Sequence, residues 1–116
     1  MNVTVLAGGV GAARFLEGVV QVVPPADVTV ISNTADDEEF FGLWVSPDID
    51  IVIYTLAGAV DAAKGWGLHD ETFETLRALG RFGFETWFNL GDADLATLTH
   101  RTMMLRDGAT LSQATR

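Results

Sequence analysis

Cysteine is absent from this chain of 116 residues, and basic residues are scarce. Without cysteine the chain has no disulfides and no thiolate chemistry, so oxygen or imidazole groups must hold any metal ion. Only 7 lysines and arginines stand against 16 acidic residues, which gives a formal net charge of −9. Because phosphate backbones need a basic protein face, this charge argues against nucleic acid as a partner.

Long apolar runs are also missing, since glycine, proline or charged residues interrupt the stretches that could cross a membrane. The first residues lead directly into an apolar segment, with no secretion signal ahead of it. We therefore expect no membrane association and a cytoplasmic protein. The length fits one small domain, and a hydrophobic content of 48% suits a buried sheet covered by helices.

Apolar patterns alternate along the chain between the spacing of strands and the spacing of helices, which predicts an α/β fold. We expect a Rossmann-like parallel sheet with flanking helices. Strands are predicted at residues 2–7 and 27–32, and helices at residues 12–22, 71–81 and 92–105. The inner faces of the first two helices carry Phe15, Leu16, Val19, Val20 and Val23, and Phe73, Leu76, Leu79 and Phe82.

Other local signals are weaker or conflict. Ser46-Pro47-Asp48 resembles a helix start with a hydroxyl cap, although Ile51-Val52-Ile53-Tyr54 favours a strand, and we favour the helix. Asp92 is expected to cap the helix that it begins. Residues 86–89 suggest a short extended segment, and a further helix begins near Thr110.

A glycine-rich turn follows the first predicted strand and reads Gly8-Gly9-Val10-Gly11. The order of strand, glycine turn and helix builds an anion site, because amide groups at the helix start point at a negative charge. Phosphate is the usual occupant, and Gly8, Gly9 and Gly11 are therefore candidate substrate-binding residues. A purely structural tight turn is the alternative.

Two acidic clusters fall near the expected crevice at the carboxyl ends of the strands. The first follows the second strand and includes Asp36, whereas the second includes Asp48 and Asp50. Carboxylates near a phosphate site suit Mg²⁺, so we expect Asp36 and Asp50 to bind this metal and to serve catalysis. Glu38 and Glu39 are interpreted as solvated loop acids. His69 and His100 have no partner at a spacing that indicates catalysis.

Six ordered motifs together resemble the amino-terminal part of the 2-phospho-L-lactate transferase family of coenzyme F420 biosynthesis. The likeness extends from residue 1 to residue 116. The motifs are Gly8-Gly9-Val10-Gly11-Ala12-Ala13-Arg14-Phe15-Leu16, Asn33-Thr34-Ala35-Asp36-Asp37, Ser46-Pro47-Asp48-Ile49-Asp50, Tyr54-Thr55-Leu56-Ala57-Gly58, Gly65-Trp66-Gly67 and Trp87-Phe88-Asn89-Leu90-Gly91-Asp92-Ala93-Asp94-Leu95-Ala96-Thr97.

The resemblance implies transfer of a phospholactyl or phosphoenolpyruvyl group from a guanosine diphospho-activated donor to the deazaflavin Fo, with release of GMP and a requirement for Mg²⁺. It implies that Asp50 and Asn89 contact the deazaflavin, and Asp92 joins them as a candidate substrate-binding residue. It also allows a homodimer. Which acid the donor carries, and which aspartate is metal ligand and which is base, stay open.

Ala35 and Leu98 depart from the family pattern, which usually has glycine and histidine there. Family chains are more than twice this length, so residues 1–116 are expected to be the amino-terminal part of one nucleotide-binding α/β transferase domain, truncated and inactive alone. Two other readings remain. One is a non-catalytic nucleotide-sugar-binding regulator of the same fold. The other is a nicotinamide-dependent oxidoreductase, although Ser32 and Asn33 occupy the place of its usual ribose-binding acid.

Overall fold

The computed structural model describes residues 1–116, which group into two compact units. The first unit comprises Met1–Glu38 and Ser46–His69, and the second comprises Glu39–Val45 and Asp70–Arg116. Each unit has its own buried apolar cluster. The chain thus builds two small cores.

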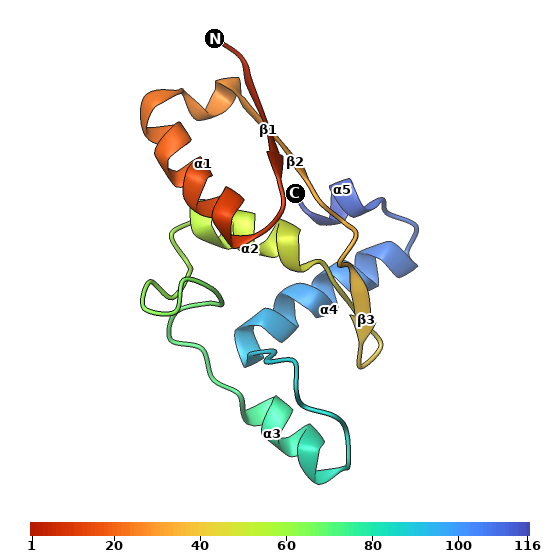
Figure 1. The fold of residues 1–116 in the computed structure, drawn as a ribbon. Coiled ribbons are helices and arrows are strands. Elements are labelled where there is room, and N and C mark those ends of the chain that lie inside the picture. The colour runs from red at the N-terminus through yellow and green to blue at the C-terminus, as the bar shows by residue number, and fades with distance from the viewer. The chain divides into compact units, whose positions relative to one another are not determined.

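The first unit opens with a strand–helix–strand arrangement (Figure 1). Strand β1 (Val3–Ala7) leads into helix α1 (Val10–Val22), and after the short 3₁₀ turn η1 (Pro25–Asp27) strand β2 (Val28–Ser32) pairs with β1 in parallel. The register places Val3 opposite Val28 and Ala7 opposite Ser32. These elements confirm the predicted α/β fold and the predicted parallel strands.

Helix α2 (Pro47–Leu56) completes the first unit and packs against α1. The helix signal of the proline therefore prevails over the strand propensity of the apolar run that follows. Apolar side chains of β1, α1 and α2 form the first core. Its buried members are Val5, Ala7, Ala13, Leu16, Ile51 and Val52.

A hairpin that the sequence patterns did not predict begins at Glu38, the last residue of the Met1–Glu38 part of the first unit, and its other residues belong to the second unit. Strands β3 (Glu38–Phe40) and β4 (Leu43–Val45) pair across the two-residue turn Phe41–Gly42. Both turn residues have positive φ, 54° and 75°. Such turns match the twist of paired strands, but they usually carry asparagine or aspartate before the glycine, so phenylalanine concealed the signal. Glu38 and Glu39 consequently lie in a strand and not in a loop.

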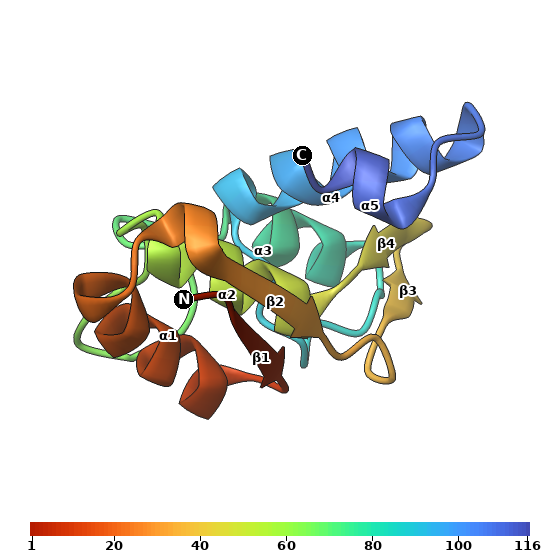
Figure 2. The same cartoon turned by 90° about the horizontal axis from the view of Figure 1, so that it is seen from above.

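Three helices form the rest of the second unit, namely α3 (Glu74–Arg81), α4 (Asp92–Arg106) and α5 (Leu111–Ala114). Helix α4 packs on β4, as Figure 2 shows, and Val45, Leu90 and Leu98 are buried there. Thr110 forms a capping box with Gln113 at the start of α5, which confirms the helix expected there.

Several details differ from the sequence predictions. Helix α1 begins two residues earlier than expected and α3 three residues later. Residues 86–89, expected as a short extended segment, belong to no helix or strand. Phe15 and Phe82 were placed on inner helix faces, but both are exposed. Neither ring belongs to the apolar cluster of its unit. None of the helices has the length and apolarity needed to span a bilayer.

Candidate functional site

The glycine turn joins β1 to α1 at the carboxyl end of β1, as the sequence predicted. Gly9 is the N-cap of α1, and its carbonyl accepts the first helical hydrogen bond from the amide of Ala13 at 3.0 Å. No side chain caps this helix, and its first turn holds no acidic residue. The first amides of α1 therefore have no acceptor from a side chain, and the helix's own first turn places no negative charge at the positive end of its dipole.

Glycine at positions 8 and 11 is explained neither by backbone conformation nor by packing. None of the three turn glycines has positive φ. A Cβ built at Gly8 or at Gly11 would meet no atom within 4 Å. A glycine that the chain itself does not need leaves room for a ligand to approach the backbone.

Asp48 is the acidic residue that the structure places against this turn. A Cβ at Gly9 would lie 3.2 Å from Oδ1 of Asp48. Asn33, directly after β2, donates a hydrogen bond from Nδ2 to Oδ2 of Asp48 at 2.7 Å. The backbone amide of Asn33 also donates to the carbonyl of Ala7 at 2.8 Å, which ties both strand ends together. Asn33 thus holds the Asp48 carboxylate beside the glycine turn.

The two aspartates expected to bind Mg²⁺ have different surroundings. Asp36 is exposed in the turn after β2, whereas Asp50 is 6% exposed in the first turn of α2. Asp50 donates its backbone amide to the carbonyl of the buried Ser46. The Ser46 hydroxyl was expected to cap α2, but it donates to Oδ2 of Asp37 at 2.7 Å instead. That bond fixes the acidic loop to the start of α2.

The structure holds no ready cluster of three or more metal-binding side chains. The carboxylate of Asp48 is the acidic group that lies beside the turn. Carboxylates are the donors that Mg²⁺ takes, and this metal usually completes its shell with substrate phosphates and water. The donor set fits a magnesium ion that binds together with a phosphate ligand. The assignment of Asp36 and Asp50 as its ligands stays a prediction.

Asn89 belongs to the second unit and is exposed. It lies between the partly buried Phe88 and Leu90, which is 1% exposed. Trp87 is 71% exposed, and its ring lies edge-on to those of Phe40 and Phe88 with centroids 5.7 and 5.6 Å away. An anchored backbone therefore presents Asn89 to solvent, next to an aromatic surface on which a ring could stack.

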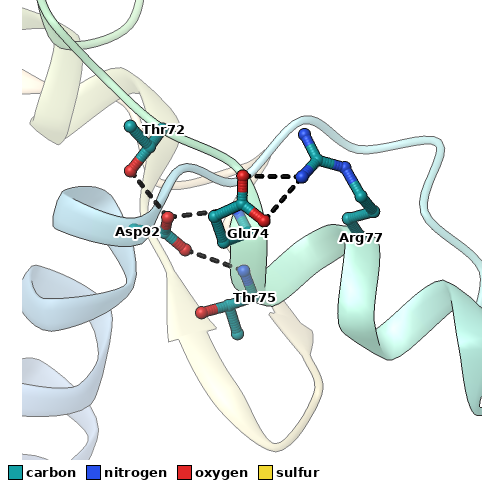
Figure 3. A network of polar contacts seen from close by, with 5 residues as sticks. All are labelled: Thr72, Glu74, Thr75, Arg77 and Asp92. Carbon is teal, nitrogen blue, oxygen red and sulfur yellow. Dashed lines mark hydrogen bonds and ion pairs between the residues drawn. The ribbon is translucent and has the colours of Figure 1, made fainter.

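Asp92 does not cap the helix that it begins. The N-cap of α4 is Gly91, which has no side chain to cap the helix. The Asp92 carboxylate instead accepts hydrogen bonds at the start of α3 (Figure 3). Its donors are the Thr72 hydroxyl at 2.7 Å, the Glu74 amide at 3.0 Å and the Thr75 amide at 2.9 Å. The Thr72 hydroxyl, followed by the Thr75 groups, holds the pKa of Asp92 well below its usual range.

Glu71, and not Asp92, caps α4, and the sequence patterns did not predict this. Its carboxylate accepts hydrogen bonds from the amides of Ala93 at 2.9 Å and Asp94 at 3.1 Å. Glu71 precedes these partners by more than 20 residues. No local spacing can reveal such a cap, because cap signals are recognised within four residues of a helix start.

Comparison with known proteins agrees with these motifs. The family model described as 2-phospho-L-lactate transferase CofD matches residues 3–116. A phosphoenolpyruvate transferase of Streptomyces griseus is 52% identical over 116 residues, and one of Streptomyces coelicolor is 51% identical. In Mycobacterium bovis BCG a protein of the same name is 47% identical over 129 residues.

These relatives are longer than the chain. The matches cover 99% of the chain but only 36% of the two Streptomyces proteins and 39% of the Mycobacterium protein. The chain therefore spans little more than a third of the length of the curated relatives that it matches.

Proposed function

Because the chain belongs to the 2-phospho-L-lactate transferase CofD family, we propose that it binds a guanosine diphospho-activated donor for a transfer reaction in coenzyme F420 biosynthesis. The acceptor would be the deazaflavin Fo, and GMP would leave. The names of the relatives, phosphoenolpyruvate transferase, favour a phosphoenolpyruvyl group over a phospholactyl group as the part transferred.

The observation that carries the proposal is the start of α1. This helix has no side-chain cap, it follows the carboxyl end of a parallel strand, and Gly8 and Gly11 leave open space above its backbone. Ligands of open α/β sheets bind outside the carboxyl ends of the strands, and phosphates bind where helix amides point outward. A donor diphosphate is the ligand that this place suits.

The reaction would proceed by displacement at phosphorus. The terminal ribityl hydroxyl of Fo forms the new oxygen–phosphorus bond, while the bond from that phosphorus to the oxygen of GMP breaks. The amides of the glycine turn hold the phosphates, and a carboxylate, Asp36 or Asp50, takes the hydroxyl proton. Positioning and charge neutralisation supply most of the rate in such transfers.

Mg²⁺ would be held by Asp36 and Asp50 together with donor phosphate oxygens, and it would offset the charge of those phosphates. On the acceptor side, Asp50 and Asn89 are the proposed contacts to the deazaflavin. The hydrogen bond from Asn33 to Asp48 would hold the negative charge of the Asp48 carboxylate at a fixed place near the phosphates. A fixed carboxylate there also favours binding of a phosphate only with its cation.

Titration separates this proposal from its two rivals. Fo fluorescence and calorimetry with GDP are measured on the chain, and a UDP-sugar and NADH are titrated in parallel. We expect the chain to bind GDP in a magnesium-dependent manner and to bind Fo, with the full-length Streptomyces griseus relative as positive control for turnover. Preference for the UDP-sugar would support a regulator and preference for NADH an oxidoreductase, and either would overturn the proposal.

A further inference from the structure

Two helices of the second unit exchange their caps. Asp92, the first residue of α4, accepts hydrogen bonds from the amides of Glu74 and Thr75 in the first turn of α3. Glu71, three residues before α3, accepts from the amides of Ala93 and Asp94 in the first turn of α4. Each helix start is therefore stabilised by a carboxylate that precedes or begins the other helix. Figure 3 shows the half of this exchange that Asp92 makes at the start of α3.

The exchange is reinforced by the backbone and by the space around it. The amide of Asp92 donates to the carbonyl of Thr72 at 2.8 Å, and the Thr72 hydroxyl donates to the Asp92 carboxylate. A Cβ at the buried Gly91 would overlap the side chain of Glu71. Gly91 has φ −80°, which any residue adopts, so the space taken by Glu71 explains the glycine.

The residues between the two helices include Asn89. This segment, residues 82–91, forms no helix or strand, so its course depends on how its two ends are held. One end follows α3, and the other reaches α4 through Leu90 and Gly91, both buried. The exchanged caps fix the two helix starts to each other and so fix the end that lies next to Asn89.

We propose that Glu71 and Asp92 are positioning residues, which hold the segment with Asn89 in the conformation that meets the acceptor. The inference rests on the proposed function, in which Asn89 contacts Fo. Asp92 therefore acts through the backbone, and its carboxylate is not a ligand of the substrate. Three hydrogen bonds from residues 72–75 engage both of its oxygens within the protein.

Amide hydrogen exchange tests the exchanged caps without any ligand. In Asp92→Asn, we expect exchange at the amides of Glu74 and Thr75 to accelerate about tenfold. In Glu71→Gln, the acceleration falls on Ala93 and Asp94. Acceleration in Asp92→Asn that is larger at the start of α4 than at the start of α3 would overturn the exchange.

Fo titration tests the positioning role. We expect Asp92→Asn and Glu71→Gln to weaken Fo affinity by a similar factor, about tenfold. The double variant should bind Fo with the same affinity as whichever single variant binds it less tightly, because both changes release the same segment. Asp92→Glu, which keeps the carboxylate, restores the affinity to within about threefold of the unsubstituted chain.

Glu85→Gln is the matched control, because Glu85 is an exposed carboxylate of the same segment and its loss changes the net charge equally. It should leave Fo affinity unchanged. Normal Fo affinity in Glu71→Gln together with a loss in Asp92→Asn would make Asp92 a direct ligand and overturn the proposal. Failure of the unsubstituted chain to bind Fo would overturn the proposed function, while hydrogen exchange would still decide on the caps.

Discussion

The starts of α1 and α4 form a contrast within one chain. Both helices begin after glycine, and in neither does the N-cap residue supply a capping side chain. A carboxylate from a distant residue, Glu71, occupies the amides of α4, whereas the amides of α1 receive no carboxylate or hydroxyl from the chain. Gly91 makes room for the capping side chain, and Gly8 and Gly11 make room that the chain leaves empty.

This difference separates a structural helix start from one that suits a ligand. Orphan amides at a helix start are ordinarily satisfied by side chains, water or a ligand, and the positive dipole end favours negative charge. At α4 the negative charge belongs to the protein. At α1 the Asp48 carboxylate lies beside the turn without capping the helix, and the acceptor for the helix amides would be a diphosphate.

The largest effect is expected at Gly91. Replacement Gly91→Ala places a methyl group where the Glu71 side chain lies, so the cap of α4 must move or break. Overpacking of this kind costs about 1–3 kcal/mol. Chemical denaturation measures this decrease in the free energy of unfolding.

Gly18→Ala serves as the control, since Gly18 lies within α1 and a Cβ there meets nothing within 4 Å. The free energy of unfolding of that variant should rise by about 0.5–1 kcal/mol, because alanine is a better helix former than glycine. Equal stabilities of the two variants would show that Glu71 can leave its place at no cost.

Gly11→Ala tests the open side of the contrast. Nothing in the chain opposes the added methyl group, and alanine favours the helix, so the free energy of unfolding should stay equal or rise by up to about 1 kcal/mol. We expect affinity for GDP to fall at least tenfold, since the methyl group enters the space proposed for phosphate. Calorimetry on this variant and on Gly18→Ala measures both the unfolding transition and the affinity for GDP. Unchanged GDP affinity would remove the turn from the site.

Local signals in the sequence were sufficient to predict strands β1 and β2 and helix α2 of the first unit. Alternating apolar residues predicted β1 and β2, and Pro47 with its two following acids predicted α2. These patterns act within one element or one turn, where propensity and spacing decide the conformation. The same logic identified the glycine turn.

Interactions between distant residues were not predictable in this way. The cap from Glu71 to α4 crosses more than 20 residues, and Ser46 bonds Asp37 although its position suits a cap. Asp48 was expected near the crevice, but its hydrogen bond with Asn33 crosses 15 residues, and no spacing reveals that bond. The hairpin turn at Phe41 was missed because its residue type is unusual for positive φ.

A moderate effect is expected at Asp36, the exposed member of the proposed metal pair. Asp36→Asn should leave the unfolding midpoint unchanged but weaken the magnesium-dependent binding of GDP several-fold, and a higher Mg²⁺ concentration should partly restore it. Glu39→Gln removes one negative charge from β3, as Asp36→Asn does from the turn after β2, and should not alter the metal dependence. Normal metal dependence in Asp36→Asn would make Asp36 a solvated loop acid.

The smallest effect is expected in the pH dependence of stability, through the Asp92 carboxylate that caps α3. Hydrogen bonds from Thr72, Thr75 and Glu74 hold the pKa of Asp92 well below its usual value of 3.8. The unfolded chain binds a proton near that value while the folded chain does not, so the stabilisation is complete above about pH 4. It is lost as the pH falls further.

The destabilisation of Asp92→Asn relative to the unsubstituted chain should therefore be constant from pH 7 to pH 5 and should shrink below pH 4. Urea denaturation at pH 7, 5 and 3 measures this difference in the free energy of unfolding between the two chains. Glu85→Gln should show a small difference at every pH, because no hydrogen-bonded carboxylate is lost. If the destabilisation by Asp92→Asn were as large at pH 3 as at pH 7, the charge of Asp92 would contribute nothing to the cap. The contrast between the starts of α1 and α4 would then rest on shape alone, without electrostatics.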